Sequence, residues 1–252
     1  MLNKVQLYYF SPTGGTKACA DIFCKGLSQN VSNVNLGLRE PVSEADGELM
    51  VFALPCYGGR VPAVAAEKIG TLKGCGKKAV TMVVYGTRAY DDALLELNNI
   101  ATAADFQIVA SAAVVAQHSM VTAVGKGRPD QEDTESITAF SGKVLEKLES
   151  GIESRISVPG NYPYKDALNL PVTPICLPAC GLCGQCVSAC PSAAMSIEDG
   201  EVKTNADSCI LCLACVSVCP KNARVVPAPL QETMNGKLAE FVSVRRENEF
   251  FL

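Results

Sequence analysis

The chain has 252 residues, of which 48% are hydrophobic and 19% charged, so it can form one large or two small folded domains and is not predominantly disordered. Its 22 Lys and Arg against 26 Asp and Glu leave a formal net charge of -4, which excludes the basic excess typical of proteins that bind nucleic acids or anionic membranes. With a single His, the chain cannot form a multi-histidine metal site, and it has no Trp. Its 13 Cys instead point to thiolate chemistry.

Short apolar runs alternate with helical patterns over residues 1–150, which is typical of an α/β domain. The last three runs are continuously apolar, as expected for parallel strands that are covered on both faces. An amphipathic stripe from Ile137 to Leu148 predicts a closing helix. The sequence therefore predicts a five-stranded parallel doubly wound sheet, with strands over residues 5–10, 34–38, 49–54, 79–85 and 108–116.

A loop rich in hydroxyl groups and glycine follows the first predicted strand and precedes the first predicted helix. Hydroxyls, free backbone N–H groups and the helix dipole at this position favour a phosphate group. The loop lacks the Gly-Lys pair of a Walker motif, and it resembles the phosphate loop of flavodoxins, which bind FMN; a plain turn is the alternative. The residues that would hold the phosphate are Ser11, Thr13, Gly14, Gly15 and Thr16.

Nine of the thirteen Cys lie between Cys176 and Cys219, after a proline-punctuated stretch typical of a linker. An internal repeat with an offset of 29 residues occurs here: CGLCGQCVSACP and CILCLACVSVCP share eight of twelve positions. Between the two copies, Met195 to Val202 is predicted to form a hairpin closed by Asp-Gly. The repeat predicts a small α+β domain with approximate two-fold symmetry.

Each copy has the spacing C-x2-C-x2-C-x3-C-P of bacterial ferredoxins, in which three Cys bind one [4Fe-4S] cluster and the fourth binds the other. Zinc or disulfides are the alternatives, but zinc would leave half of the thiols unexplained and disulfides require an oxidising compartment. The spacing thus predicts two clusters. The first set of ligands is Cys180, Cys183, Cys186 and Cys219, and the second set is Cys209, Cys212, Cys215 and Cys190.

Two further loops follow the third and fourth predicted strands, at the sheet edge where doubly wound folds bind ligands. In flavodoxins, loops at these positions embrace the isoalloxazine ring. Here glycines permit a close approach of the backbone, and two tyrosines offer faces for stacking, unless they are merely half-buried loop residues. The predicted contacts are Pro55, Tyr57, Gly58 and Gly59 in loop 55–62, and Gly86, Thr87, Arg88, Tyr90 and Asp92 in loop 85–92.

Taken together, these loops, the two cluster motifs and the tail motif from Arg245 to Asn248 resemble the flavodoxin/ferredoxin fusion family of anaerobic bacteria and archaea. The resemblance covers nearly the whole chain and implies FMN, two [4Fe-4S] clusters and electron transfer. One departure concerns loop 85–92, in which the family often has Asn where this chain has Thr87. If that side chain touches the flavin, its hydrogen bond and the flavin potential would differ.

The predicted organisation is a flavodoxin-like FMN domain over 1–150, a linker over 151–175, a ferredoxin domain over 176–228 and a partly helical tail over 229–252, with Leu238, Phe241 and Val242 docked on a domain. The predicted function is relay of low-potential electrons between the clusters and FMN, with redox proteins as partners. A flavin-dependent reductase of a small acceptor such as a quinone or nitro compound, and an iron–sulfur redox sensor, remain open; no residue is predicted to be catalytic.

Three isolated residues have weaker signals. His118 has no nucleophile beside it in the sequence, so a structural role is favoured over a catalytic one. Cys176 and Cys56 have no ligand spacing, and their roles stay open. No secretory signal or membrane span is expected, which predicts a reducing cytoplasm.

Overall fold

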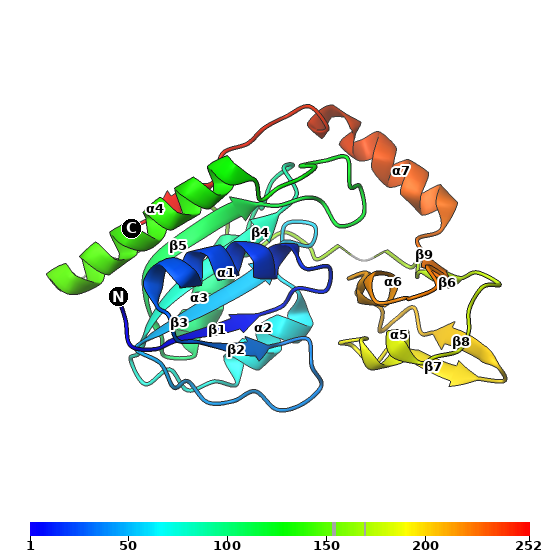
Figure 1. Cartoon of the computed structure of the whole chain (residues 1–252), viewed down its shortest axis with the longest axis horizontal. Helices are drawn as coiled ribbons and strands as arrows, with labels where there is room; N and C mark the ends of the chain where they lie inside the picture. The colour runs from blue at the N-terminus through cyan, green and yellow to red at the C-terminus, as the bar shows by residue number, and fades with distance from the viewer. Residues whose placement is uncertain (153–154, 169) are drawn as a thin grey trace.

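The computed structural model describes residues 1–152, 155–168 and 170–252 (Figure 1). Its largest sheet has the strand order β2-β1-β3-β4-β5-β10, and the first five of these strands are parallel. The order 2-1-3-4-5 is that of the flavodoxin-like doubly wound fold, so the predicted fold class is confirmed. The strands are β1 (Val5–Tyr9), β2 (Val31–Asn35), β3 (Leu49–Pro55), β4 (Lys78–Tyr85), β5 (Gln107–Val115) and β10 (Glu249–Phe251).

The central strands bury both of their faces, as their continuous apolar sequences predict. In β3, Leu49 and Val51 contribute to the core on one face, and Met50 and Phe52 to the core on the other. Helices α1 (Gly15–Leu27) and α4 (Gln131–Ser150) cover the first face, while α2 (Ala63–Gly70) and α3 (Ala93–Ala103) cover the second. The edge strand β2 is only half-buried and begins three residues before the predicted run, because an edge strand needs no continuous apolar sequence.

The C-terminal tail returns to the sheet and adds a strand that the sequence did not predict. After α7 (Ala228–Leu238) and a short 3-10 turn (Ala239–Phe241), β10 pairs antiparallel with β5. As predicted, Leu238 and Phe241 dock, packing with Val121 and Val124 from the segment after β5. Val242 is 48% exposed, so its predicted docking is wrong: it follows the last residue of the 3-10 turn and its side chain lies at the surface.

The Cys-rich part consists of two short halves related by the 29-residue offset. Helix α5 (Gln185–Ser188) in one half corresponds to α6 (Ala214–Ser217) in the other. The predicted hairpin is present as β7 (Met195–Glu198) and β8 (Glu201–Thr204), and β6 (Ile175–Cys176) pairs with β9 (Arg224–Val225). Figure 1 shows this part beside the edge at which β1 and β2 end. Among the described residues, no helix has the length and apolar character needed to cross a membrane.

Candidate cofactor sites

The two halves of the Cys-rich part repeat each other in backbone conformation. In each C-x2-C loop the residue before the second Cys has a positive φ, 53° at Leu182 and 50° at Leu211. The residue before each short helix also has a positive φ, 75° at Gly184 and 63° at Leu213. Because leucine rarely adopts this conformation, the backbone shape that the two loops share is strained at Leu182 and Leu211.

The fourth Cys of each copy accepts a backbone hydrogen bond at the equivalent position. Ala194 N–H donates to Cys190 Sγ at 3.3 Å, and Ala223 N–H donates to Cys219 Sγ at 3.2 Å. Burial opposes ionisation of Cys219, but backbone N–H groups of Ala223 and its neighbours lower the pKa of this thiol. The two halves thus place a backbone N–H donor at the sulfur of the fourth Cys.

The second set of cysteines lines one hollow of about 330 Å³, including its opening to solvent. Its wall is apolar and contains Ile210, Leu213 and Met195 beside all four predicted ligands, Cys190, Cys209, Cys212 and Cys215. Among the described residues, no three His, Cys, Asp or Glu side chains converge closely enough to hold a single metal ion. All four predicted ligands of the second set thus line a single hollow.

The first set lies nearer to solvent. Cys186 is buried, Cys180 and Cys219 are half-buried, and Cys183 is exposed. Large apolar side chains of the same part are also exposed, among them Leu182. The two predicted sites therefore differ in exposure, because the first set contains an exposed Cys and the second does not.

The structure adds Arg224, which the sequence analysis did not identify. Arg224 is 3% exposed, and its guanidinium donates to Cys176 Sγ at 3.3 Å and to Thr204 Oγ1 at 3.0 Å. Its Nε–H is buried without a partner among the described residues. In the sequence, only the repeat marks this position: Arg224 stands 29 residues after Met195. In the structure, both residues are buried.

The phosphate loop leads from β1 into α1 with its hydroxyl groups at different depths. Thr13 and Gly14 are exposed, Ser11 and Gly15 are half-buried, and Thr16 is buried. Ser11 Oγ accepts the backbone N–H of Lys17 at 2.9 Å and so fixes the loop against the helix. The first N–H groups of a helix have no intrahelical partner, so this end of α1 retains donors for an anion.

Loops 55–62 and 85–92 lie against each other at the ends of β3 and β4. Asp92 N–H donates to Gly59 C=O at 3.1 Å, and the Tyr57 ring packs edge-on against Phe10 with centroids 6.4 Å apart. Burial raises the pKa of Tyr57 well above its ordinary value. Burial likewise raises the pKa of Cys56 to about 12, so its thiol is protonated and a poor nucleophile.

Other residues predicted to contact the flavin have partners within the protein. Tyr90 is 7% exposed and donates to Glu249 of the tail at 2.9 Å, and Arg88 forms an ion pair with Asp91. Asp92 accepts the backbone N–H groups of Asn161 at 2.8 Å and of Lys165 at 2.7 Å. Flavin contacts of Tyr90, Arg88 and Asp92 stay predictions. Of the remaining predicted contacts, Pro55, Gly58 and Gly86 are half-buried.

Thr87 differs from its neighbours in loop 85–92. It is fully buried with a φ of 62°, which is unusual for a β-branched residue, and its Oγ1 has no hydrogen-bond partner among the described residues. A buried hydroxyl without a partner costs free energy. Two buried side-chain atoms thus have no hydrogen-bond partner among the described residues, Thr87 Oγ1 and Arg224 Nε. One lies in the predicted flavin region and the other in the predicted cluster region. Both regions therefore fit a bound group that supplies the missing partner.

The linker crosses the same loops. Arg60 donates to Lys165 C=O at 2.7 Å, stacks on the Tyr164 ring at 4.9 Å and pairs with Glu96 at 2.6 Å. A Cβ added at Gly58 would lie 2.6 Å from Leu168 Cβ, so only glycine permits this approach. The linker is therefore fixed to the sheet edge at the predicted flavin loops.

His118 has the geometry of a structural histidine. Its Nδ1 accepts the backbone N–H groups of Met120 at 3.2 Å and of Val121 at 2.9 Å, and burial lowers its pKa. Two N–H donors at Nδ1 require the neutral tautomer that carries its proton on Nε2. The imidazole thus holds the turn after β5, in agreement with the structural role favoured by the sequence.

The Cys-rich part contacts the sheet through residues next to the second set. Arg39, after β2, donates to the carbonyl groups of Val187 at 2.6 Å and Cys190 at 3.2 Å. Ile210 and Cys212 pack on the same core cluster as Tyr57 of loop 55–62. The second cysteine set thus contacts the core cluster to which loop 55–62 also belongs.

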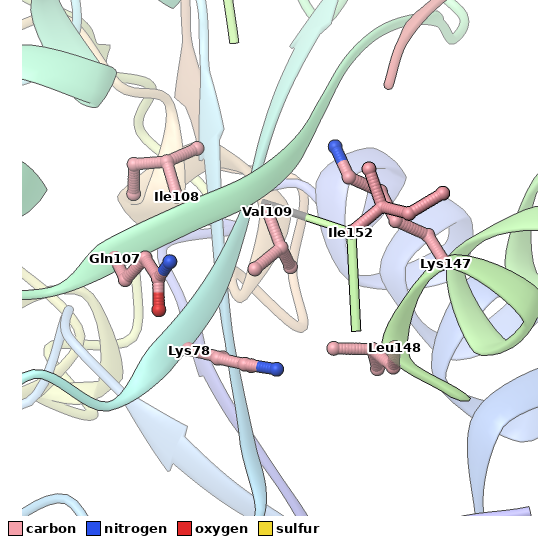
Figure 2. A pocket seen from close by; sticks show the side chains of 7 residues that line it. All are labelled: Lys78, Gln107, Ile108, Val109, Lys147, Leu148 and Ile152. Carbon is pink, nitrogen blue, oxygen red and sulfur yellow. The ribbon is translucent and has the colours of Figure 1, made fainter. Parts of the chain in front are cut away.

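A second hollow lies at the end of the sheet where β4 and β5 begin, away from the loops that follow these strands (Figure 2). It is formed where β4 and β5 begin and α4 ends, and it has an empty volume of about 270 Å³, including its opening. None of the predicted site residues lies there. Its lining consists of Lys78, Gln107, Ile108, Val109, Lys147, Leu148 and Ile152.

Residues 179–223 match the family model of the 4Fe-4S dicluster domain, and no curated protein matches the chain. Similar solved structures cover the sheet domain. The flavodoxin of Streptococcus pneumoniae TIGR4 is 16% identical over 57% of this chain and 99% of its own, with a TM-score of 0.44. Rubredoxin oxygen:oxidoreductase from Desulfovibrio gigas is 14% identical over 60% of this chain and 37% of its own, with a TM-score of 0.44.

A flavodoxin variant of Fusobacterium nucleatum, solved with flavin mononucleotide, is 14% identical over 61% of this chain and 99% of its own, with a TM-score of 0.42. Since these identities and scores are low, the fold assignment rests on the strand order described above. The chain thus joins a flavodoxin-like sheet to a segment that matches the 4Fe-4S dicluster family.

Proposed function

Because a flavodoxin-like sheet and a 4Fe-4S dicluster segment are joined in one chain, we propose that this protein relays low-potential electrons between two [4Fe-4S] clusters and FMN. The observation that carries the proposal is the contact of Cys212 and Ile210 with the core cluster that also receives Tyr57 of loop 55–62. A relay between two cofactors in one chain requires such proximity. When bound, the clusters exchange single electrons, and FMN accepts or donates one or two.

The proposed roles of the chain are to hold, separate and order these groups. The first cysteine set would hold the outer cluster near solvent, where a redox protein can approach, and the second would hold the inner cluster beside loop 55–62. Arg39 would keep the two parts docked, since its guanidinium caps carbonyls of the helix that precedes Cys190. Electrons would then enter at the exposed first set and leave toward the flavin loops.

We further propose the predicted domain limits, 1–150, 151–175, 176–228 and 229–252, as functional units. The first would bind FMN, the third would bind both clusters, and the linker and tail would hold the two together. The linker contacts at Arg60 and Asp92 support this docking role. Redox proteins of the cytoplasm are the proposed partners.

Thr13→Ala is expected to weaken FMN binding by about 1–3 kcal/mol, because it removes an exposed hydroxyl that would donate to the phosphate. Calorimetric titration of flavin-free protein with FMN measures the change. Thr138→Ala is the matched control, since Thr138 is exposed on α4 outside the phosphate loop. Equal FMN affinity in both variants would show that the phosphate lies elsewhere.

Electron transfer within the chain is expected to be independent of protein concentration. In a stopped-flow experiment, dithionite or a low-potential ferredoxin supplies two electrons per protein and is itself oxidised, and the flavin absorbance reports their arrival. Arg39→Leu should slow this arrival by a few-fold, because fewer molecules are docked, whereas Arg155→Leu removes an exposed Arg of the linker and should not.

A rate that scales with protein concentration would exclude an internal relay. A flavin that stays oxidised while the iron–sulfur absorbance bleaches would instead favour the redox-sensor alternative. Turnover of a quinone or nitro compound with a defined saturation constant would favour the reductase alternative.

A further inference from the structure

Arg224 is a buried cation without a carboxylate partner among the described residues. Its side chain is 3% exposed, and its guanidinium donates to Cys176 Sγ and to the Thr204 hydroxyl. Its Nε–H has no partner there. Burying a guanidinium without a counter-charge costs several kcal/mol, so an uncompensated Arg would not be expected at this position.

Arg224 has neighbours at both cysteine sets. The preceding residue, Ala223, donates its backbone N–H to Cys219 Sγ of the first set at 3.2 Å, and the Arg224 guanidinium donates to Thr204, which lines the hollow of the second set. Arg224 therefore lies next to both predicted cluster sites. Four thiolates give each occupied site a net negative charge, which is the counter-charge that the described residues do not supply.

The internal repeat shows that an Arg is not required by the local fold. Met195 occupies the equivalent position in the first half, is 6% exposed and packs with Cys186, Cys190 and Cys215. An unbranched apolar side chain of similar length thus fills the same place in a nearly identical backbone. The cation at position 224 is a departure from the symmetry of the repeat.

On the basis of the proposed function, we infer that Arg224 is a positioning residue that raises the reduction potential of both clusters, through its charge and through the Nε–H donor that has no protein partner. Reduction adds a negative charge to each cluster, and a nearby buried cation stabilises the reduced form more than the oxidised form. Hydrogen bonds to cluster sulfur act in the same direction. Arg224 would then bring the two potentials into the range in which electrons pass on to the flavin.

Arg224→Met tests the inference, because it makes the second half resemble the first at this position. EPR-monitored redox titration of anaerobically purified protein measures the potentials, and iron analysis confirms that both clusters are present. At a fixed ambient potential, the ratio of reduced to oxidised cluster should fall about tenfold, equal to about 59 mV for a one-electron couple. Arg224→Lys keeps the positive charge but lacks Nε–H, so the ratio of reduced to oxidised cluster should fall by less than in Arg224→Met.

Lys221→Met is the matched control, since it removes an exposed cation two residues after Cys219 and should change the ratio less than twofold. Unchanged potentials in an iron-replete Arg224→Met protein would overturn the inference. If Arg224→Met loses iron and Arg224→Lys does not, the redox titration of Arg224→Lys decides the inference, and unchanged potentials in that variant would overturn it. Loss of iron from both variants would assign Arg224 to cluster assembly and would also overturn it. The proposed relay is judged separately, by concentration-independent flavin reduction in the unaltered protein.

Discussion

Replacing Cys183 by Ser is expected to lower the iron and acid-labile sulfide of anaerobically purified protein from about eight atoms of each per chain to about four or fewer. Cys183 is the exposed member of the first set, so its substitution removes one proposed ligand without opening a cavity. Buried Cys side chains, Cys186, Cys190 and Cys215, form most of the core of the Cys-rich part. So small an apolar core would depend on bound metal for its stability, so we expect the loss to extend to the proposed second cluster.

Cys75→Ser is the control for this experiment. Cys75 is equally exposed and lies outside both sets, so its substitution should leave about eight iron atoms per chain. Full iron content in Cys183→Ser would show that the ligand sets are assigned incorrectly. Zinc in place of iron in the unaltered protein would overturn the cluster proposal as a whole.

Arg128→Met is expected to reduce the free energy of unfolding by about 3–5 kcal/mol, because it leaves the carboxylate of Asp133 buried and without its cation. The side chains of this ion pair are 5% and 1% exposed, and Arg128 Nε donates to Asp133 Oδ2 at 2.9 Å. Arg128 also donates to Arg246 C=O at 2.6 Å, and Asn248 donates to Asp133 at 3.0 Å. The pair therefore holds the C-terminal tail on α4.

Chemical denaturation of the full chain, followed by far-UV circular dichroism, measures this change. Arg245→Met is the matched control, because Arg245 pairs with Asp130 and Glu132 at the surface and is 37% exposed. Exposed pairs contribute less than about 1 kcal/mol. A loss in Arg128→Met no larger than that in Arg245→Met would show that the buried pair does not hold the tail.

The sequence predicted those parts of the fold that depend on neighbouring residues. Continuous apolar runs predicted β3, β4 and β5, since a strand covered on both faces has no polar alternation. The Asp-Gly pair predicted the hairpin, in which Asp199 and Gly200 have φ values of 53° and 75°. The cysteine spacing predicted two ligand sets, of which the structure places the second around one hollow.

Other features depend on residues far apart in the chain. Strand β10 has only three residues. It is held in place by contacts with distant residues: Asn248 accepts Val115 N–H at 2.9 Å, and Glu249 accepts the Tyr90 hydroxyl. No local pattern marks such a strand. The predicted Tyr90 contact with a flavin likewise ignored Glu249, 159 positions away in the sequence.

By itself, then, the sequence determined the fold class, the repeat and the residues that could bind clusters, because periodicity, turn chemistry and ligand spacing are local properties. Only the tertiary structure decided that Cys212 of the second set packs on the core cluster to which loop 55–62 also belongs, that the linker lies on that loop, and that Arg224 is buried beside Cys176 and Thr204. Each of these depends on packing between distant segments, where burial and charge act through space and leave no periodic signal along the chain.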